Sequence, residues 1–173
     1  TYFVDAGDAF FNSPYADPVN KDKKQTLANT ILDAYNRMGC QLMNVGIYDL
    51  SYGTEFLAGL REKANFPFIS ANIRYKENEQ LVYEPYAVIQ TPDLKLGFVG
   101  VTNGDSRHQD LSFSDPIESA QQTVSYIRDK VDLVFLLANV NDLYEHRLSE
   151  EVEGVDFLIR SNTPRISRQP KVM

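Results

Sequence analysis

The chain has 173 residues, 43% of them hydrophobic and 24% charged, a composition typical of a globular protein that can bury a core. No apolar run approaches the roughly 18 residues of a membrane span. The single cysteine, Cys40, excludes an internal disulfide and a cysteine-based zinc site. The net charge of −7 and the scattered Lys and Arg residues argue against nucleic-acid binding.

The first half of the chain alternates strand and helix signals. A β-branched and aromatic run predicts a strand at residues 1–6, ended by Gly7 and a proline-containing loop. Apolar residues at spacings of three and four predict a helix at 21–38, with Gly39 after its C-terminus. Its apolar face is expected to hold Leu27, Ile31, Ala34, Tyr35 and Met38. Shorter signals predict a strand at 41–45, a helix at 52–64 capped by Ser51, and a strand at 66–71.

The second half continues the alternation. Two apolar runs, 86–90 and 94–101, flank Thr91-Pro92-Asp93 and predict a β-hairpin. Ser114 or Asp115 is expected to cap a helix that begins at Pro116 and ends near Val131. The other predictions are a loop or edge hairpin at 73–85, a loop at 102–114, a strand covered on both faces at 132–138, a helix at 143–152 and a buried strand at 155–159. This order predicts an α/β fold with a layered mixed β-sheet and flanking helices.

Polar residues follow the carboxyl ends of the predicted strands, where open α/β sheets place their sites. Most are neutral, and the chain has only two histidines, His108 and His146, neither at a strand end. A hydrolytic metal site or a nucleophile–base pair therefore lacks the imidazoles it ordinarily uses. The loops after the strands contain Asp8, Tyr48, Asp49, Asn72, Asn103, Asn139, Asn141, Arg160, Ser161 and Asn162.

Six segments, in order, resemble the 5′-nucleotidase branch of the calcineurin-like metallophosphoesterases. They read VDAGDAFF, YNRMGCQLMNVGIYDLSYGTEFL, FPFISANI, LKLGFVGVT, DLVFLLANV and LSEEVEGVDFLIRSNTP. The resemblance implies that family's fold, and active members hydrolyse phosphate esters with two divalent metal ions such as Mn or Zn. The family's first motif, Asp-x-His, and its last strands have no counterpart here. We therefore expect residues 1–173 to form a single metallophosphoesterase-like domain that is incomplete at both ends and part of a longer chain.

The family's metal-binding motifs are altered in this sequence. Gly-Asp, whose carboxylate bridges the two metals in the family, is kept as Gly7-Asp8. In the motif Gly-Asn-His-Glu, Ile47 replaces the metal-binding Asn and Tyr48 replaces the His that assists the leaving group. Asp49 stands at the Glu, which is not a direct ligand in the family.

The last two motifs have also lost their imidazoles. Asn139 stands where the family has the His of Ser-His, and Asn162 and Pro164 fall within Gly-His-x-His. Amide oxygens bind transition metals weakly, and Asp8 alone cannot offset the repulsion between two divalent ions. We therefore expect no cofactor and, at most, a weak relict metal ligand at Asp8. The relict cleft is assigned to Asp5, Ile47, Tyr48, Asp49, Asn139 and Asn162.

Each of these residues also has a simpler, structural interpretation. Asp8 can stabilise the turn after its strand, and Asp49 can stabilise the loop that follows the second strand. Asparagine side chains bond readily to neighbouring backbone, which accounts for Asn139 and Asn162. The Tyr48 ring can pack against other side chains while its hydroxyl forms a hydrogen bond. His108 and His146 are expected to be solvated.

Two functions remain open at this stage. The first is a catalytically degenerate domain that acts in binding or assembly, with a protein or a small phosphate-containing molecule as its partner. The alternative is an active metal-dependent phosphohydrolase on nucleotides or other phosphate esters, with ligands supplied from outside this chain. A third hypothesis is phosphate binding by Arg160, Arg165 and Arg168. The resemblance implies a periplasmic or extracellular location, and no nucleic-acid partner or membrane span is expected.

Overall fold

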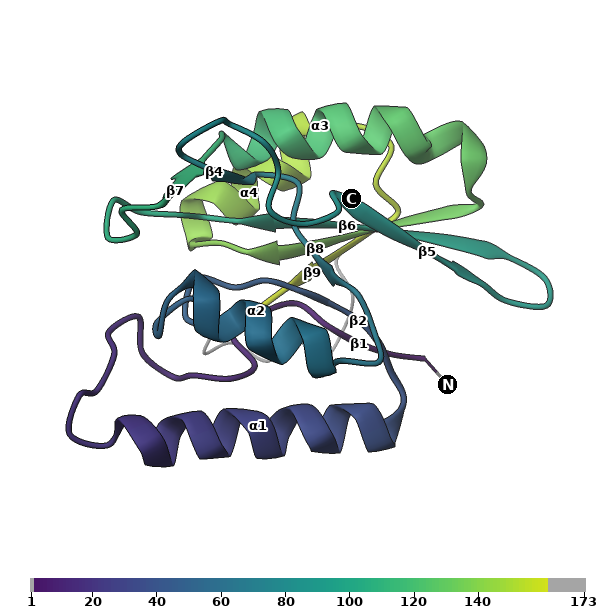
Figure 1. Ribbon diagram of the computed structural model, residues 1–173. Helices are drawn as coiled ribbons and strands as arrows, with labels where there is room; N and C mark the ends of the chain where they lie inside the picture. Colours follow the sequence, from purple (N-terminus) through teal and green to yellow (C-terminus); the bar gives the residue numbers. More distant parts are fainter. Residues whose placement is uncertain (1, 162–173) are drawn as a thin grey trace.

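A computed structural model describes the structure of residues 2–161 (Figure 1). Helices and strands alternate along most of the chain, as the sequence predicts. In chain order they are β1 (Phe3–Asp5), α1 (Lys21–Met38), β2 (Cys40–Asn44), α2 (Thr54–Lys63), β3 (Phe68–Ile69), β4 (Ile73–Tyr75), β5 (Tyr86–Gln90), β6 (Lys95–Thr102), β7 (Leu111–Phe113), α3 (Pro116–Ile127), β8 (Leu133–Asn139), α4 (Asp142–Glu151) and β9 (Phe157–Arg160).

Two sheets lie face to face between two layers of helices (Figure 1). One sheet is parallel, in the order β1-β2-β3, and α1 and α2 cover its outer face. The other sheet is mixed, in the order β5-β6-β8-β9, and α3 and α4 cover it. The layered α/β class predicted from the sequence is confirmed, with the strands divided between separate sheets.

An apolar layer of five buried side chains joins the two sheets. This inter-sheet layer comprises Leu42, Ile69, Leu96, Phe98 and Leu137. Two further apolar clusters fill the spaces between each sheet and its helices. Burial of apolar surface on both faces explains why the run that forms β8 lacks polar alternation.

Helix α1 has the predicted bounds, and Gly39 ends it with φ 74°, a left-handed conformation that glycine adopts without strain. The predicted apolar face was partly wrong. Ala28 and Leu32 are the buried residues of α1, whereas Leu27 and Met38 are exposed. Ile31 and Tyr35 pack against the apolar core as predicted, so the buried stripe of the helix is displaced toward Ala28 and Leu32.

Helix α2 and helix α3 differ in their caps. Ser51 does not cap α2, because Gly53 precedes the helix and the Ser51 hydroxyl instead donates to the carbonyls of Tyr48 and Ser13. Asp115 caps α3 as one of the two predicted residues, and it accepts from the N–H groups of Ile117 and Glu118. Helix α3 ends at Ile127 and continues as a 3₁₀ turn, Arg128–Lys130.

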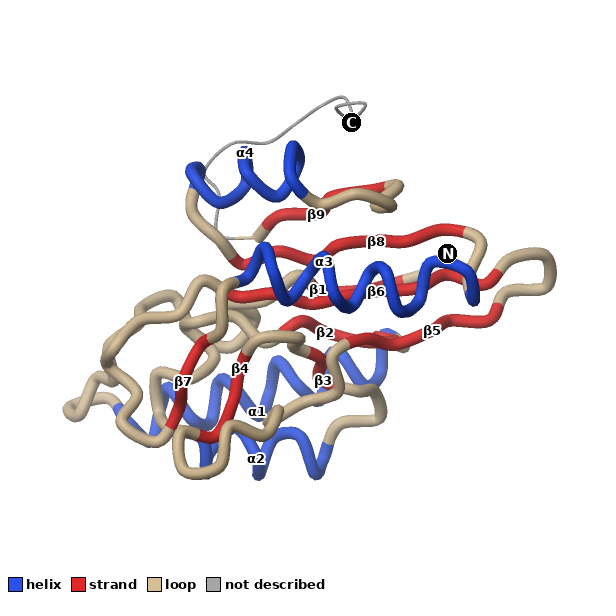
Figure 2. Tube along the Cα trace, turned by 90° about the horizontal axis from the view of Figure 1, so that it is seen from above, coloured by secondary structure: helices blue, strands red, loops and turns tan. Residues whose placement is uncertain are grey.

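Two strand predictions need correction. The stretch expected to be a loop at 102–114 contains β7, which pairs antiparallel with β4, and Figure 2 shows the two strands side by side, at an angle to the larger sheet. Strand β9 is not buried, because it lies at the edge of its sheet with Phe157 and Ile159 exposed. Both differences depend on which strands pair, and local sequence patterns do not contain that information.

Candidate functional site

The polar residues after four strands meet at one edge of the two sheets. Asp8 follows β1, Asp49 follows β2, Asn139 ends β8 and Ser161 follows β9. Hydrogen bonds join these four side chains to one another or to the same short loops, and we call them the strand-end cluster. The carboxyl ends of parallel strands lie at a common edge, which is why residues up to 155 positions apart come into contact.

Asp8 is held in a positive-φ conformation, with φ 65°. Its Oδ1 accepts from the Tyr48 backbone N–H at 2.7 Å, and its Oδ2 accepts from Asn139 Nδ2 at 2.8 Å. Gly46 passes so close that a Cβ there would lie 2.3 Å from Asp8 Oδ1. Burial raises the pKa of the Asp8 carboxyl, and the two hydrogen bonds offset part of that rise.

Asp49 is fully buried and anchors the loops from beneath. Its Oδ2 accepts from the N–H groups of Asp8 and Gly46, both at 2.9 Å, and its Oδ1 accepts from Phe10 N–H at 3.0 Å. Burial, and next the charge of Asp8, raise the pKa of Asp49 to about 7 despite these three donors. Asp49 has no exposed oxygen, so its contacts are those of a structural residue.

Asn139 connects both sheets through one amide group. Its Oδ1 accepts from Ile47 N–H at 2.9 Å, and its Nδ2 donates to Asp8 Oδ2 and to Ser161 Oγ, both at 2.8 Å. The Ser161 hydroxyl in turn donates to the Ala6 carbonyl at 2.8 Å. The polar atoms of the Asn139 side chain therefore all have partners within the protein.

Two buried asparagines lie behind the cluster: the sequence places Asn72 after a predicted strand but does not single out Asn44. Asn44 Nδ2 donates to the carbonyls of Ala6 and Val101, both at 3.1 Å, and so joins the two sheets. Asn72 accepts from Thr102 N–H at 2.9 Å and donates to the Thr102 carbonyl at 2.7 Å. A polar residue at the end of an apolar strand was the only sequence signal for Asn44.

The other predicted residues lie around or apart from this cluster. Asp5 accepts from Gly7 N–H at 2.7 Å and from the Tyr35 hydroxyl at 2.8 Å, toward α1, and burial raises its pKa. Tyr48 is half-buried and packs against the apolar cluster below the parallel sheet. Asn162, together with Pro164, Arg165 and Arg168, lies outside the described residues.

The two histidines differ from each other. His146 is exposed on α4, as expected, and lies 3.1 Å from Glu150. His108 is half-buried beside Phe113, which corrects the expectation that it is solvated, and burial lowers its pKa. Neither belongs to the strand-end cluster.

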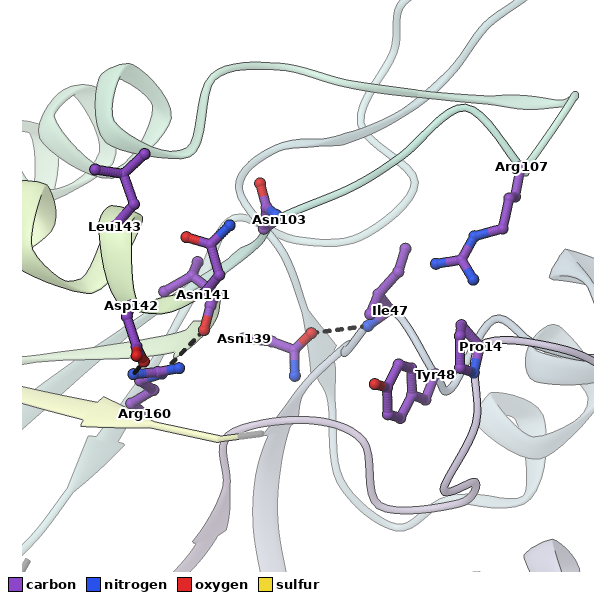
Figure 3. Close-up of a pocket in the computed structure, with 11 residues that line it drawn as sticks. Pro14, Ile47, Tyr48, Asn103, Arg107, Asn139, Asn141, Asp142, Leu143 and Arg160 are labelled. Carbon is purple, nitrogen blue, oxygen red and sulfur yellow. Dashed lines mark hydrogen bonds and ion pairs between the residues drawn. The ribbon is translucent and has the colours of Figure 1, made fainter. Parts of the chain in front are cut away.

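A cleft of about 590 Å³ opens above the cluster (Figure 3). Asn103 and Asn139 lie at its centre, between one wall formed by residues of α4 and another formed by the loops after β1 and β2. Asn141, Asp142 and Leu143 lie on the α4 side, next to Arg160 at the end of β9. Pro14, Ile47 and Tyr48 lie on the other side, next to Arg107 from the loop after β6. Arg107 and Leu143 were not singled out in the sequence, because the loop and helix that carry them have no motif.

The residues of this cleft do not fit two divalent metal ions. Both carboxylate oxygens of Asp8 accept hydrogen bonds, Ile47 offers no side-chain donor atom, and the Asn139 oxygen accepts from Ile47 N–H. Within residues 2–161, no three His, Cys, Asp or Glu side chains are grouped to hold an ion. Paired divalent ions ordinarily need several anionic or imidazole ligands.

Within the described part of the chain, no helix combines the length and the apolar character needed to cross a membrane.

Proteins named as nucleotidases and phosphodiesterases are similar to this chain in sequence. It is 25% identical over 154 residues to a 2′,3′-cyclic-nucleotide 2′-phosphodiesterase/3′-nucleotidase of Haemophilus influenzae, covering 79% of this chain and 23% of the relative. It is 26% identical over 114 residues to a 5′-nucleotidase of Vibrio cholerae, covering 61% of this chain and 21% of the relative. The chain thus spans less than a quarter of the length of these two relatives. No family model matches the chain.

Solved structures share the fold. The sulfate thiohydrolase SoxB of Thermus thermophilus aligns with a TM-score of 0.77 at 21% identity, over 95% of this chain and 31% of that protein. The calcineurin-like phosphoesterase YfkN of Bacillus subtilis aligns with a TM-score of 0.72 at 22% identity, over 92% of this chain and 57% of that structure. These matches confirm the resemblance: the chain is similar in sequence to a 5′-nucleotidase and a 3′-nucleotidase, and it shares the fold of calcineurin-like phosphoesterases.

Proposed function

We propose that residues 1–173 form one 5′-nucleotidase-like domain that does not hydrolyse phosphate esters and instead acts in binding or assembly. The observation that carries this proposal is the bonding of Asp8 and Asn139. Each carboxylate oxygen of Asp8 accepts a protein hydrogen bond, and the Asn139 amide lies directly against that carboxylate at 2.8 Å. A metal ion at Asp8 would have to displace these bonds and would gain only weak ligands in return.

In this proposal, hydrogen bonds take over the structural role that ions have in the active relatives. The Asn139 amide links the loops after β1, β2 and β9 without any added charge. The shared fold does not determine the reaction, since the thiohydrolase and the phosphoesterase that align with this chain have different chemistries. The function therefore has to follow from the residues of the cleft.

The alternative is an active phosphohydrolase whose missing ligands come from outside residues 1–173. The retained Asp8 favours it, as does the small share of each relative that this chain spans. The geometry supports it less well, because Ile47 places an apolar side chain in the cleft where a ligand is needed.

Hydrolysis assays on the full-length protein test this proposal. p-Nitrophenyl phosphate and AMP serve as substrates, with Mn²⁺ or Zn²⁺ and with EDTA, and isothermal titration measures metal binding. We expect no metal-dependent turnover and no micromolar binding of two ions. Turnover that needs metal, is lost in Asp8→Asn and is kept in the exposed control Asp33→Asn would establish the alternative.

We also propose that the protein acts in the periplasm or outside the cell, a location that the sequence resemblance implies. Cell fractionation with an antibody against this domain is the direct measurement. Recovery of the protein in the cytoplasmic fraction alone would contradict the location without affecting the proposed absence of catalysis.

A further inference from the structure

In the described part of the chain, the positive charges around the cleft are paired with carboxylates. Arg160 is held by the Val140 carbonyl at 2.9 Å, by Asp142 at 2.5 Å and by Glu145, so two carboxylates surround one guanidinium. Arg107 pairs with Asp105 and lies 5.0 Å from the centre of the Tyr15 ring. Neither arginine is an unpaired cation, and Asp8 adds a further carboxyl below the cleft floor.

The polar groups that have no partner in the cleft are uncharged. Within residues 2–161, the Tyr48 hydroxyl and the Asn103 side-chain amide form no hydrogen bond, and both line the cleft. Asn141 uses its Oδ1 to accept from Tyr144 N–H at 3.1 Å, which leaves its amide N–H groups for a ligand. Together these groups offer donors and acceptors but no charge.

The walls add apolar contact area. Ile47, Val140 and Leu143 line the cleft, and the Leu143 side chain is 68% exposed. The volume of about 590 Å³ lies in the range of small-molecule sites, which combine apolar walls with a few polar groups.

We propose, building on the non-hydrolytic function above, that this cleft binds an uncharged molecule with hydrogen-bonding groups and one apolar face, such as a nucleoside or a glycoside, and disfavours its phosphate ester. The unpaired amide and hydroxyl groups recognise the neutral ligand. Among residues 2–161, the cleft presents no unpaired cation to a phosphate dianion, and the carboxylates around Arg160 repel it.

Matched ligand pairs test the proposal on the full-length protein in EDTA. Adenosine is compared with AMP, and methyl α-glucoside with glucose 6-phosphate, by isothermal titration at pH 7.5. We expect at least one neutral member to bind and its phosphate ester to bind about tenfold more weakly or worse. Equal or tighter binding of the ester, or no binding by either neutral compound, would overturn the proposal.

Two variants locate the bound ligand. Asn103→Ala and Tyr48→Phe each remove one unpaired polar group, and we expect each to weaken binding about 2- to 10-fold. Tyr75→Phe removes an exposed hydroxyl on β4 and is the matched control, with no change expected. Unchanged affinity in both cleft variants would show that the ligand binds elsewhere and would refute the assignment to this cleft.

Different experimental results would refute the two proposals. Metal-dependent hydrolysis of AMP would refute the non-hydrolytic function, whatever adenosine does in EDTA. Failure of both neutral compounds to bind in EDTA would refute the ligand class and leave the absence of catalysis standing.

Discussion

The inter-sheet layer and the strand-end cluster lie along the same strands but are stabilised in different ways. Leu42, Ile69 and Leu137 meet between the sheets through apolar contacts, which have no required direction. A few residues further on, Asp49 and Asn139 each bond to particular backbone or side-chain atoms. Substitutions in the layer should therefore lower the free energy of unfolding in proportion to the side-chain volume that is lost. Substitutions in the cluster should lower it in proportion to the number of donors or acceptors left without partners.

Leu137→Ala should have the largest effect on stability. Its side chain is fully buried between the sheets, so truncation leaves a cavity and should lower the free energy of unfolding by about 2–5 kcal/mol. Urea denaturation measures the change. Leu27→Ala, on the exposed side of α1, is the control, with a change expected within about 0.5 kcal/mol. A loss below 1 kcal/mol for Leu137→Ala would show that the layer repacks.

Asp49→Asn tests the most buried member of the cluster. All three of its partners are N–H donors, so an amide NH₂ in place of one oxygen would face a donor and leave it unpaired. We expect a loss of about 2–3 kcal/mol in the free energy of unfolding, although the side chain keeps its size. Asp33→Asn on α1 is the isosteric control and should change stability little. Similar stability in both variants would contradict the anchoring role of Asp49.

The contrast between layer and cluster also shows how far the sequence can be interpreted. The apolar run of β8 and the glycine that ends α1 identify those elements locally, because burial and backbone conformation are properties of short segments. The sequence also places Asp8 and Asn139 at strand ends. It does not show that they bond to each other, since 131 residues separate them. The exposure of Phe157 likewise depends on strand order.

Asn139→Ala should destabilise the protein less than the two substitutions above. It leaves Asp8 Oδ2, Ser161 Oγ and Ile47 N–H without their partner, but water can reach part of this half-buried region. We expect a loss of about 1–3 kcal/mol, measured by urea denaturation. Asn103→Ala removes an amide that makes no bond within residues 2–161 and should remain within about 0.5 kcal/mol of the parent protein.

A negative charge introduced at residue 139 distinguishes a hydrogen-bonded cluster from a metal site. Asn139→Asp would place a second carboxylate against Asp8 and should lower the melting temperature in EDTA, because like charges repel. Added Mn²⁺ should raise the melting temperature of the variant part of the way back and leave the melting temperature of the parent protein unchanged. An increase in the melting temperature of the parent protein with Mn²⁺ would show that its cluster already accepts an ion.

The smallest effect is expected in the pH dependence of stability. Burial raises the pKa of Asp5, Asp8 and Asp49 above their ordinary value of 3.8, to about 7 for Asp49. At these three carboxyls the folded protein therefore binds more protons than the unfolded chain, and they contribute stability at low pH that is lost as the pH rises through their raised pKa values. Asp8→Asn removes one of these groups and the charge that helps raise the pKa of Asp49. Urea denaturation from pH 4 to 8 should show a shallower decline, or a steeper rise, of stability with pH in Asp8→Asn than in the parent protein. Parallel curves would mean that Asp8 has the same pKa in the folded and unfolded states, so that the hydrogen bonds from Tyr48 N–H and Asn139 fully offset the effect of burial.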